Sequence, residues 1–213
     1  MTKPFLNEFL RFDDTSTFCF FDFETEGLNL FRARPWQVGV IMVKGDESYE
    51  EHDIYVYWKD LKVSKEAAAK TGYDEEKVKR LGITPEAALD ILEDKFNSAD
   101  YVIGHNAVFY DNYIYRGWCK KLGRKPIDLR EKLLDTFLFA KSIKLDIPFR
   151  PDVDRFAFFM KLYGEIVKRL GTSLSVLAKE HGFDVDQGQT HDALYDLRMN
   201  VHVWNKIKWT IPV

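Results

Sequence analysis

The chain has 213 residues, 46% of them hydrophobic and 15% aromatic, and its formal charge at pH 7 is −3. This length and apolar content predict a single packed domain over residues 1–213. The charge argues against a protein that wraps duplex DNA through a broad basic face, because such binding needs many phosphate contacts. An enzyme that binds only the end of a nucleic-acid strand needs a few basic side chains near its site. The candidates, each equally compatible with an ordinary solvated surface, are Arg32, Arg34, Lys120, Lys121, Arg124 and Lys125.

The sequence carries no pattern that targets a protein for export or places it in a membrane. Residues 1–14 lack the apolar stretch of a signal peptide, and no run of about 18 apolar residues occurs. Cys19 and Cys119 are too few for a disulfide scaffold or a zinc site. These features predict a soluble, cytoplasmic protein with reduced thiols and no membrane partner.

The hydrophobic pattern predicts three strands followed by strands that alternate with helices. Strands are expected at residues 18–25, 36–43 and 52–58, within 100–106 and at the start of 131–142. Helices are expected to begin within 73–80 and to cover 64–72, 84–97, 107–123, 156–171, 173–182 and 191–207, with a loop near 144–155. The pattern favours an α/β fold, in which helices cover a mixed sheet made of a three-stranded meander and further strands.

Two carboxylates interrupt the aromatic first strand, FCFFDFET at residues 18–25. Because side chains alternate along a strand, Asp22 and Glu24 point to one face and the neighbouring phenylalanines to the other. Two like charges in a poorly solvated place are unfavourable unless a cation lies between them or one takes up a proton. A divalent metal ion would meet this need. A second Asp-x-Glu, Asp74 and Glu76, opens a solvated helix and is interpreted as ordinary surface.

Asp111 and Asp196 are two further acids beside expected core elements. Asp111 lies on a helix that begins just past a strand end, where open α/β sheets build their sites, and Asn106 before it fits an N-cap equally well. Asp196 borders the apolar stripe of the C-terminal helix. His191 reaches the same place only from the loop before that helix, with Thr190 as N-cap. A loop histidine beside carboxylates fits a general base, and a solvated helix-start histidine is the alternative.

Three segments together resemble the motifs of the DEDD 3′-to-5′ exonucleases of the ribonuclease-H-like superfamily. They are Asp22-x-Glu24-Thr25, GHNAVFYD at residues 104–111 and HDALYD at residues 191–196. The third motif, with its histidine, resembles that of the DEDDh subfamily, which includes proofreading exonuclease subunits, ribonuclease T, oligoribonuclease and exonuclease I. The second motif has one residue more than the commonest HNAxFD form, a spacing that exonuclease I and oligoribonuclease also show. RARPWQ at residues 32–37 is likewise more similar to exonuclease I than to the proofreading subunits.

The resemblance implies a five-stranded mixed sheet with antiparallel and parallel strands, and a mechanism that uses two divalent ions, Mg²⁺ or Mn²⁺. It implies that Asp22 bridges the ions, that Glu24 and Asp196 hold the first, and that Asp111 acts through bound water. His191 would take the proton from the attacking water. Expected substrate-binding residues are Thr25, Gly27, Leu28, Asn106 and Phe109, with Leu28 wedged against the bases and Phe109 equally compatible with core packing.

The implied activity is the release of nucleoside 5′-monophosphates from the 3′ end of single-stranded DNA or RNA, with DNA favoured. Acting as a proofreading subunit, the chain would have a polymerase as its partner. One alternative is a polymerase accessory module that kept the fold and lost the chemistry, which should lack at least one of the five catalytic residues. A second alternative is a structure-specific endonuclease of the ribonuclease-H-like class, against which the order of the motifs argues.

Overall fold

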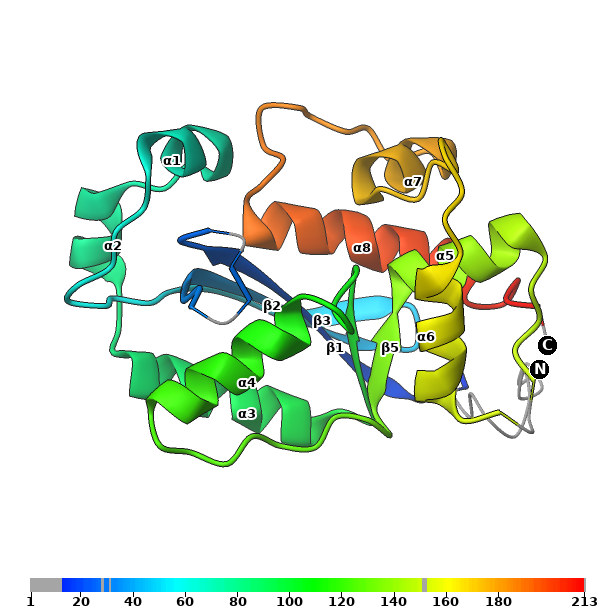
Figure 1. Ribbon diagram of the computed structural model, residues 1–213, viewed down its shortest axis with the longest axis horizontal. Coiled ribbons are helices and arrows are strands. Elements are labelled where there is room, and N and C mark those ends of the chain that lie inside the picture. Colours follow the sequence, from blue (N-terminus) through cyan, green and yellow to red (C-terminus); the bar gives the residue numbers. More distant parts are fainter. Residues whose placement is uncertain (1–12, 28, 31, 151–152, 213) are drawn as a thin grey trace.

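The computed structural model describes residues 13–27, 29–30, 32–150 and 153–212, and its centre is a five-stranded sheet (Figure 1). The strands are β1 (Thr17–Thr25), β2 (Pro35–Lys44), β3 (Glu47–Tyr55), β4 (Tyr101–Gly104) and β5 (Leu133–Asp135). They lie in the order β3-β2-β1-β4-β5. The first three form an antiparallel meander, and β4 and β5 run parallel to β1. The predicted mixed sheet is therefore confirmed.

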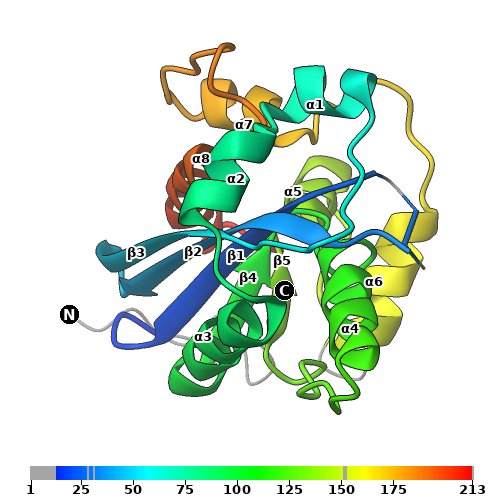
Figure 2. The ribbon, with the colours of Figure 1, turned by 90° about the vertical axis from the view of Figure 1, so that its left-hand side faces the viewer.

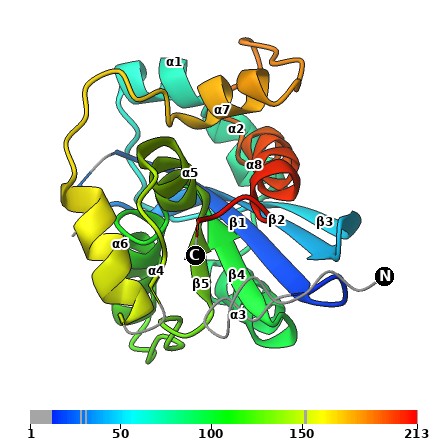
Figure 3. The same cartoon turned by 90° about the vertical axis from the view of Figure 1, so that its right-hand side faces the viewer.

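Helices cover both faces of this sheet. They are α1 (Lys65–Thr71), α2 (Glu75–Leu81), α3 (Pro85–Ser98), α4 (Asp111–Lys121), α5 (Thr136–Leu145), α6 (Arg155–Gly164), α7 (Leu174–Glu180) and α8 (Ala193–Ile207). Figure 2 shows α5 and α8 on one face and α3 and α4 on the other. Helix α8 packs on β1 and β2, and α7 packs on α8, farther from the sheet (Figure 3).

The aromatic face of β1 forms the centre of the core. Phe21 and Phe23 are buried, and their rings contact Phe96 of α3 and Trp118 of α4 at centroid distances of 5.0 and 6.2 Å. The two acids of β1 therefore face away from α3, as the strand period predicts. Both cysteines are free and buried.

The start of β3, the start of α4 and the end of α6 differ from the predicted boundaries, each for a local reason. Strand β3 begins at Glu47 because its polar first half pairs with β2 through the backbone, which hydropathy does not reveal. Helix α4 begins at Asp111 because residues 107–110 form turns. Helix α6 ends at Gly164, and glycine is a poor helix former.

The structure also bears on the predictions about export and membranes. Most of the N-terminal segment without a signal-peptide pattern lies outside the described residues. Within the described ranges, none of the helices has the length and apolar character needed to span a bilayer.

Candidate active site

The predicted catalytic residues gather where the parallel strands end. Strands β1, β4 and β5 run in the same direction, so their carboxyl ends share one edge of the sheet. Asp22 and Glu24 stand near the end of β1, and Asp111 is the first residue of α4, which follows β4. This edge is where open α/β sheets bind their ligands.

A glycine lets α8 reach this edge closely. In the β1–β2 register Asp22 is paired with Gly39. A Cβ atom on Gly39 would lie 2.9 Å from the backbone carbonyl carbon of Ala193, a distance that real Cβ atoms essentially never show. The first turn of α8 therefore rests directly on the sheet beside Asp22, and Asp196 lies in that first turn.

His191 lies on the loop before α8, as the helix geometry requires. Its backbone amide donates a 3.3 Å hydrogen bond to Oδ2 of Asp196. Its φ of +70° is in the left-handed region, which costs a non-glycine residue about 1 kcal/mol or more and is often kept at functional sites. The predicted N-cap is wrong: Asp192 caps α8 by accepting from the Tyr195 amide at 2.9 Å. Thr190 instead donates its hydroxyl to the Gln187 carbonyl at 3.0 Å.

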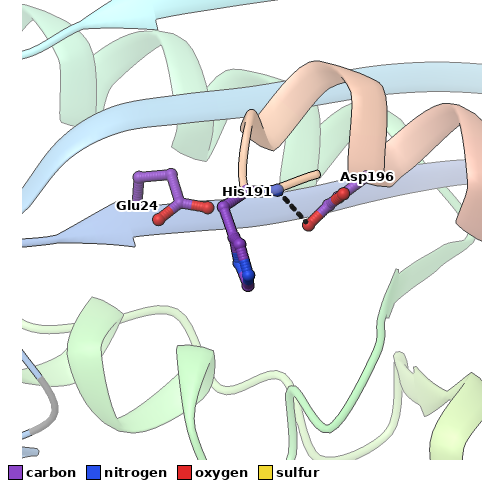
Figure 4. A group of neighbouring side chains, drawn as sticks. All are labelled: Glu24, His191 and Asp196. Carbon is purple, nitrogen blue, oxygen red and sulfur yellow. Dashed lines mark hydrogen bonds between the residues drawn. The ribbon is translucent and has the colours of Figure 1, made fainter. Parts of the chain in front are cut away.

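Glu24, His191 and Asp196 form a compact group of potential metal ligands. One ligand atom of each lies within 4.8 Å of the others. Figure 4 shows the two carboxylates, from β1 and from the start of α8, on either side of the His191 backbone, with the imidazole ring extending away from it. Two segments far apart in the sequence, β1 and residues 191–196, thus supply one cation-sized cluster.

Asp22 and Asp111 belong to the same electrostatic group. Burial raises the pKa of Asp22 well above its ordinary value, and the charges of Asp111, Glu24 and Asp196 add to the rise. Burial also raises the pKa of Asp111 to about 7, against hydrogen bonds from its own amide and that of Phe23. The pKa of Asp196 rises to about 7, again mainly through burial. Asp22, Asp111 and Asp196 are therefore poorly stabilised as anions by the protein alone.

The loop before Asp111 is held by a buried carboxylate. Asp135, at the end of β5, accepts hydrogen bonds from the amides of Asn106 and Val108 at 2.9 and 3.0 Å. Asn106 has a φ of +63° and does not cap α4, whose N-cap is Tyr110 without a side-chain hydrogen bond. The alternative interpretation of Asn106 as an N-cap is therefore wrong, and the loop owes its shape to Asp135.

A pocket of about 420 Å³ opens beside Glu24 and His191. Its lining comprises Phe23, Glu24, Thr25, Gly27, Glu66, Ala67, Thr71, Tyr110 and His191. The Thr25 hydroxyl lies 2.9 Å from both the Gly27 carbonyl and the Tyr110 hydroxyl, which fixes the wall of the pocket. Two of the expected substrate-binding residues, Thr25 and Gly27, therefore share a cavity with two expected catalytic residues.

The other three expected substrate-binding residues are placed differently. Leu28 lies outside the described residues. Asn106 and Phe109 do not line this pocket. The Phe109 ring stacks on Tyr163 of α6, with centroids 3.9 Å apart. Their roles stay predictions.

The exonuclease (RNase_T) family model matches residues 19–204, nearly the whole chain. The chain belongs to this exonuclease family. The resemblance of its motifs to DEDD 3′–5′ exonucleases of the ribonuclease-H-like superfamily is thereby confirmed. A comparison with curated protein sequences gave no match.

Solved structures of Escherichia coli exonuclease I share the fold of this exonuclease-family chain. The zinc-bound complex with single-stranded DNA superposes with a TM-score of 0.71 at 19% identity, covering 91% of this chain and 41% of exonuclease I. The complex with a dT13 oligonucleotide gives a TM-score of 0.70, at the same identity and coverage. The complex with a dA16 oligonucleotide gives 0.68 at 19% identity, covering 92% and 42% of the two chains. The chain therefore spans about two fifths of the length of these structures.

The acidic cluster fits the divalent metal use that the exonuclease family implies. Among the described residues, neither Oδ1 of Asp111 nor Oδ1 of Asp196 has a hydrogen-bond partner, although both atoms are buried. Buried polar atoms without partners are costly, and a cation would supply the missing interaction. Carboxylate oxygens are the ligands that hard divalent cations prefer.

Three residues that support the site were not identified from the sequence. Asp135 orders the loop before Asp111, the Tyr110 hydroxyl braces Thr25, and Gln37 anchors the loop that carries His191. Asp135 is the last residue of β5, and an acid at the end of a short apolar strand was an available signal. Nothing in the local sequence distinguishes Tyr110 or Gln37 from ordinary core or strand residues.

Proposed function

We propose that this chain is a metal-dependent 3′–5′ exonuclease that acts on single-stranded nucleic acid, with DNA preferred, and releases nucleoside 5′-monophosphates. The observation that carries the proposal is the convergence of Asp22, Glu24, Asp111, His191 and Asp196 at one sheet edge in a member of the exonuclease family. The accessory-module alternative expects at least one of these five residues to be lost, and all five are present.

The four carboxylates would hold two divalent ions, Mg²⁺ or Mn²⁺. When bound, such ions neutralise charge that develops on the attacking and leaving oxygens of a phosphodiester. The protein's part is to keep the carboxylates converged on rigid elements, which β1, α4 and α8 do. The raised pKa values of Asp22, Asp111 and Asp196 favour cation binding, because a bound cation replaces the proton that burial otherwise favours.

His191 is assigned the role of general base. In the hydrolysis a water oxygen forms a bond to phosphorus, the bond from phosphorus to the 3′ oxygen of the preceding nucleotide breaks, and the water proton moves to the imidazole. The leaving 3′ oxygen takes up a proton from solvent, so the preceding nucleotide carries the new 3′ hydroxyl. His191 is exposed on its loop and lines the pocket beside Glu24, so its ring can reach a water there.

The pocket beside Glu24 is assigned to the terminal nucleotide. Thr25 and Gly27 supply polar atoms on its wall, and its volume of about 420 Å³ is within the range of small-ligand sites. DNA is favoured over RNA because the similar structures of exonuclease I hold DNA oligonucleotides. Exoribonuclease activity with the same residues is the alternative.

Three other sequence-based predictions accompany this proposal. We expect the chain to form one exonuclease domain over residues 1–213 and to act in the cytoplasm. A polymerase is the expected partner if the chain proofreads.

A gel time course with 5′-labelled single-stranded DNA and RNA of one sequence tests the proposal. Each substrate is incubated with Mg²⁺ or with a chelator, using the wild type and Asp22→Ala. We expect a ladder that shortens one nucleotide at a time from the 3′ end, faster on DNA, and absent with the chelator or the variant.

Other outcomes separate the alternatives. Faster shortening of RNA would assign the chain as an exoribonuclease, and internal fragments would indicate an endonuclease. Binding without shortening would favour the accessory module.

A further inference from the structure

A second cavity lies on the outer side of α4, away from the acidic cluster. It has a volume of about 560 Å³ and is lined by Leu30, Tyr113, Arg116, Gly117, Lys120, Gly123, Arg124 and Pro126. We call it the α4 groove. Tyr113, Arg116, Gly117 and Lys120 recur at three- and four-residue steps, so they form one stripe along the helix.

The α4 groove is basic. The described residues that line it include three cationic side chains and no acid. Arg124 is neutralised by Asp90 and Glu93, each 2.5 Å away. Within the described residues neither Arg116 nor Lys120 makes an ion pair, and Asp128, the acid whose pKa Arg116 helps to lower, is paired with Arg130 at 2.6 Å. Two positive charges are thus available in a chain whose net charge is −3.

The groove also presents an aromatic surface. The side chain of Tyr113 is 46% exposed, although most large hydrophobic side chains of the protein are buried. Gly117, one turn farther along, has no side chain, and the nearest atom to a Cβ placed there, the Leu30 carbonyl oxygen, would be 3.9 Å away. An exposed ring beside a bare helix surface and two free cations is the combination that stacks bases and pairs phosphates of a single strand.

The α4 groove and the pocket assigned to the terminal nucleotide are lined by neighbouring residues of the same two segments. Gly27 lines that pocket and Leu30, three residues later, lines the groove. Tyr110 and Tyr113 make the same transition at the start of α4. A strand whose last nucleotide lies beside Thr25 can therefore extend from Gly27 and Tyr110 toward Leu30 and Tyr113.

We propose that the α4 groove binds the part of the single strand that precedes the terminal nucleotide, with a base on Tyr113 and phosphates at Arg116 and Lys120. The inference rests on the proposed exonuclease function, because it extends the substrate from the same site. The groove makes affinity depend on the length of the strand, whereas the acidic cluster and its pocket contact only the terminal nucleotide and contribute equally to the binding of short and long strands.

The test compares binding of 5′-fluorescein-labelled dT3 and dT12 in EDTA, where neither is cut. The ratio of the two dissociation constants cancels the contribution of the terminal-nucleotide pocket. We expect the wild type to bind dT12 about tenfold or more tightly than dT3, since one stacked base alone is worth roughly 5- to 150-fold. Tyr113→Ala should lose most of that ratio and leave dT3 binding unchanged.

Two further variants separate charge from shape. Arg116→Gln/Lys120→Gln should also lose the ratio and lower the slope of log Kd against log salt concentration by about 1.4, which is 0.7 for each of two phosphate contacts. Gly117→Leu should fill the groove without changing the charge or weakening the helix. The matched control is Lys179→Gln/Lys206→Gln on α7 and α8, which removes two charges elsewhere and should keep the ratio.

The outcomes distinguish this inference from the function on which it rests. A ratio that survives in all groove variants, or that falls equally in the control, would overturn the groove. Cleavage of dT3 by the wild type with Mg²⁺ in that case would leave the exonuclease proposal intact. Cleavage of neither strand, with the ratio lost only in the groove variants, would overturn the exonuclease and keep the groove as a nucleic-acid-binding surface.

Discussion

The side-chain amide of Gln37 donates a 3.0 Å hydrogen bond to Oδ2 of Asp192, the residue after His191. The same nitrogen donates to Oδ1 of Asp53 at 2.8 Å. Gln37 is only 1% exposed and stands on β2 opposite Glu24. The loop that carries the proposed general base is therefore tied to the strand next to the acidic pair.

Replacing Gln37 should slow the chemical step without weakening substrate binding. In Gln37→Leu, Asp53 and Asp192 lose the donor that they share, and the loop loses its anchor to β2. A displacement of about 1 Å can cost on the order of 100-fold in rate. We expect the single-turnover rate of nucleotide release to fall about 10- to 100-fold, with oligonucleotide affinity in EDTA near the wild-type value.

Asn205→Leu is the matched control for this prediction. Its side-chain amide donates one hydrogen bond, to the Asp46 carbonyl at 3.0 Å, near the other end of α8. This variant should keep the wild-type rate. A Gln37→Leu enzyme as fast as the wild type would mean that the loop is positioned by other contacts.

Replacing His191 should act on the same step more strongly. General bases contribute about 10²- to 10⁴-fold, so His191→Ala should lower the single-turnover rate by that factor and leave affinity unchanged. His181→Ala, at the end of α7, is the control, because the His181 backbone carbonyl bonds to the His202 ring of α8 and this histidine is not part of the acidic cluster. Equal rates for the two variants would remove His191 from the reaction.

The sequence predicts the acidic pair of β1 well because its geometry is local. Alternation along one strand is enough to place Asp22 and Glu24 on one face, whatever the rest of the fold does. The position of His191 before α8 is also local, since a continuous helix would turn it away from Asp196. The N-cap was misplaced because the competing partner of Thr190, the Gln187 carbonyl, depends on the fold of the loop.

The supporting contacts are not predictable because their partners are distant in sequence. Gln37 bonds to residues 16 and 155 positions away. Asp135 holds amides 27 and 29 positions earlier in the chain. Gln37 does not differ by type or spacing from an ordinary polar residue on a strand, and the acid at the end of β5 does not reveal which amides Asp135 holds. The convergence of β1, β4, β5 and α8 has to be known first, and single-sequence patterns give elements without their arrangement.

Divalent ions should stabilise the fold through the acidic cluster. A ligand at 100 times its Kd adds about 2.7 kcal/mol, or roughly 5–10 °C in Tm for a chain of this size. We expect such a rise with Mg²⁺ or Mn²⁺ by thermal melting, and a much smaller one in Asp196→Asn. Asp74→Asn changes the second Asp-x-Glu, at the start of α2, and should respond as the wild type does. An equal response in Asp196→Asn would place the ions elsewhere.

Removing the buried charge of Asp111 should stabilise the metal-free protein while abolishing cleavage. Burial raises the pKa of Asp111 to about 7, from 3.8 for an ordinary aspartate. The folded state thus keeps a proton that the unfolded chain releases, so the contribution to stability is full below about pH 4, falls between pH 4 and 7, and is lost above pH 7. In EDTA, Asp111→Asn should therefore exceed the wild type in Tm by a margin that grows from pH 5 to pH 8. The gain in the free energy of unfolding should be on the order of 1–3 kcal/mol, and each kcal/mol should raise the Tm by roughly 2–4 °C.

The control for this pH dependence has the opposite sign. Arg130 lowers the pKa of the exposed Asp128 to about 2, so ionisation of Asp128 favours the folded state. Asp128→Asn should therefore give no gain in Tm at any of these pH values. Excess Mg²⁺ at pH 8 should shrink or reverse the margin of Asp111→Asn, because only the wild type recovers stability when the cation neutralises the cluster. A margin independent of both pH and Mg²⁺ would show that Asp111 is not an ionised ligand in this cluster.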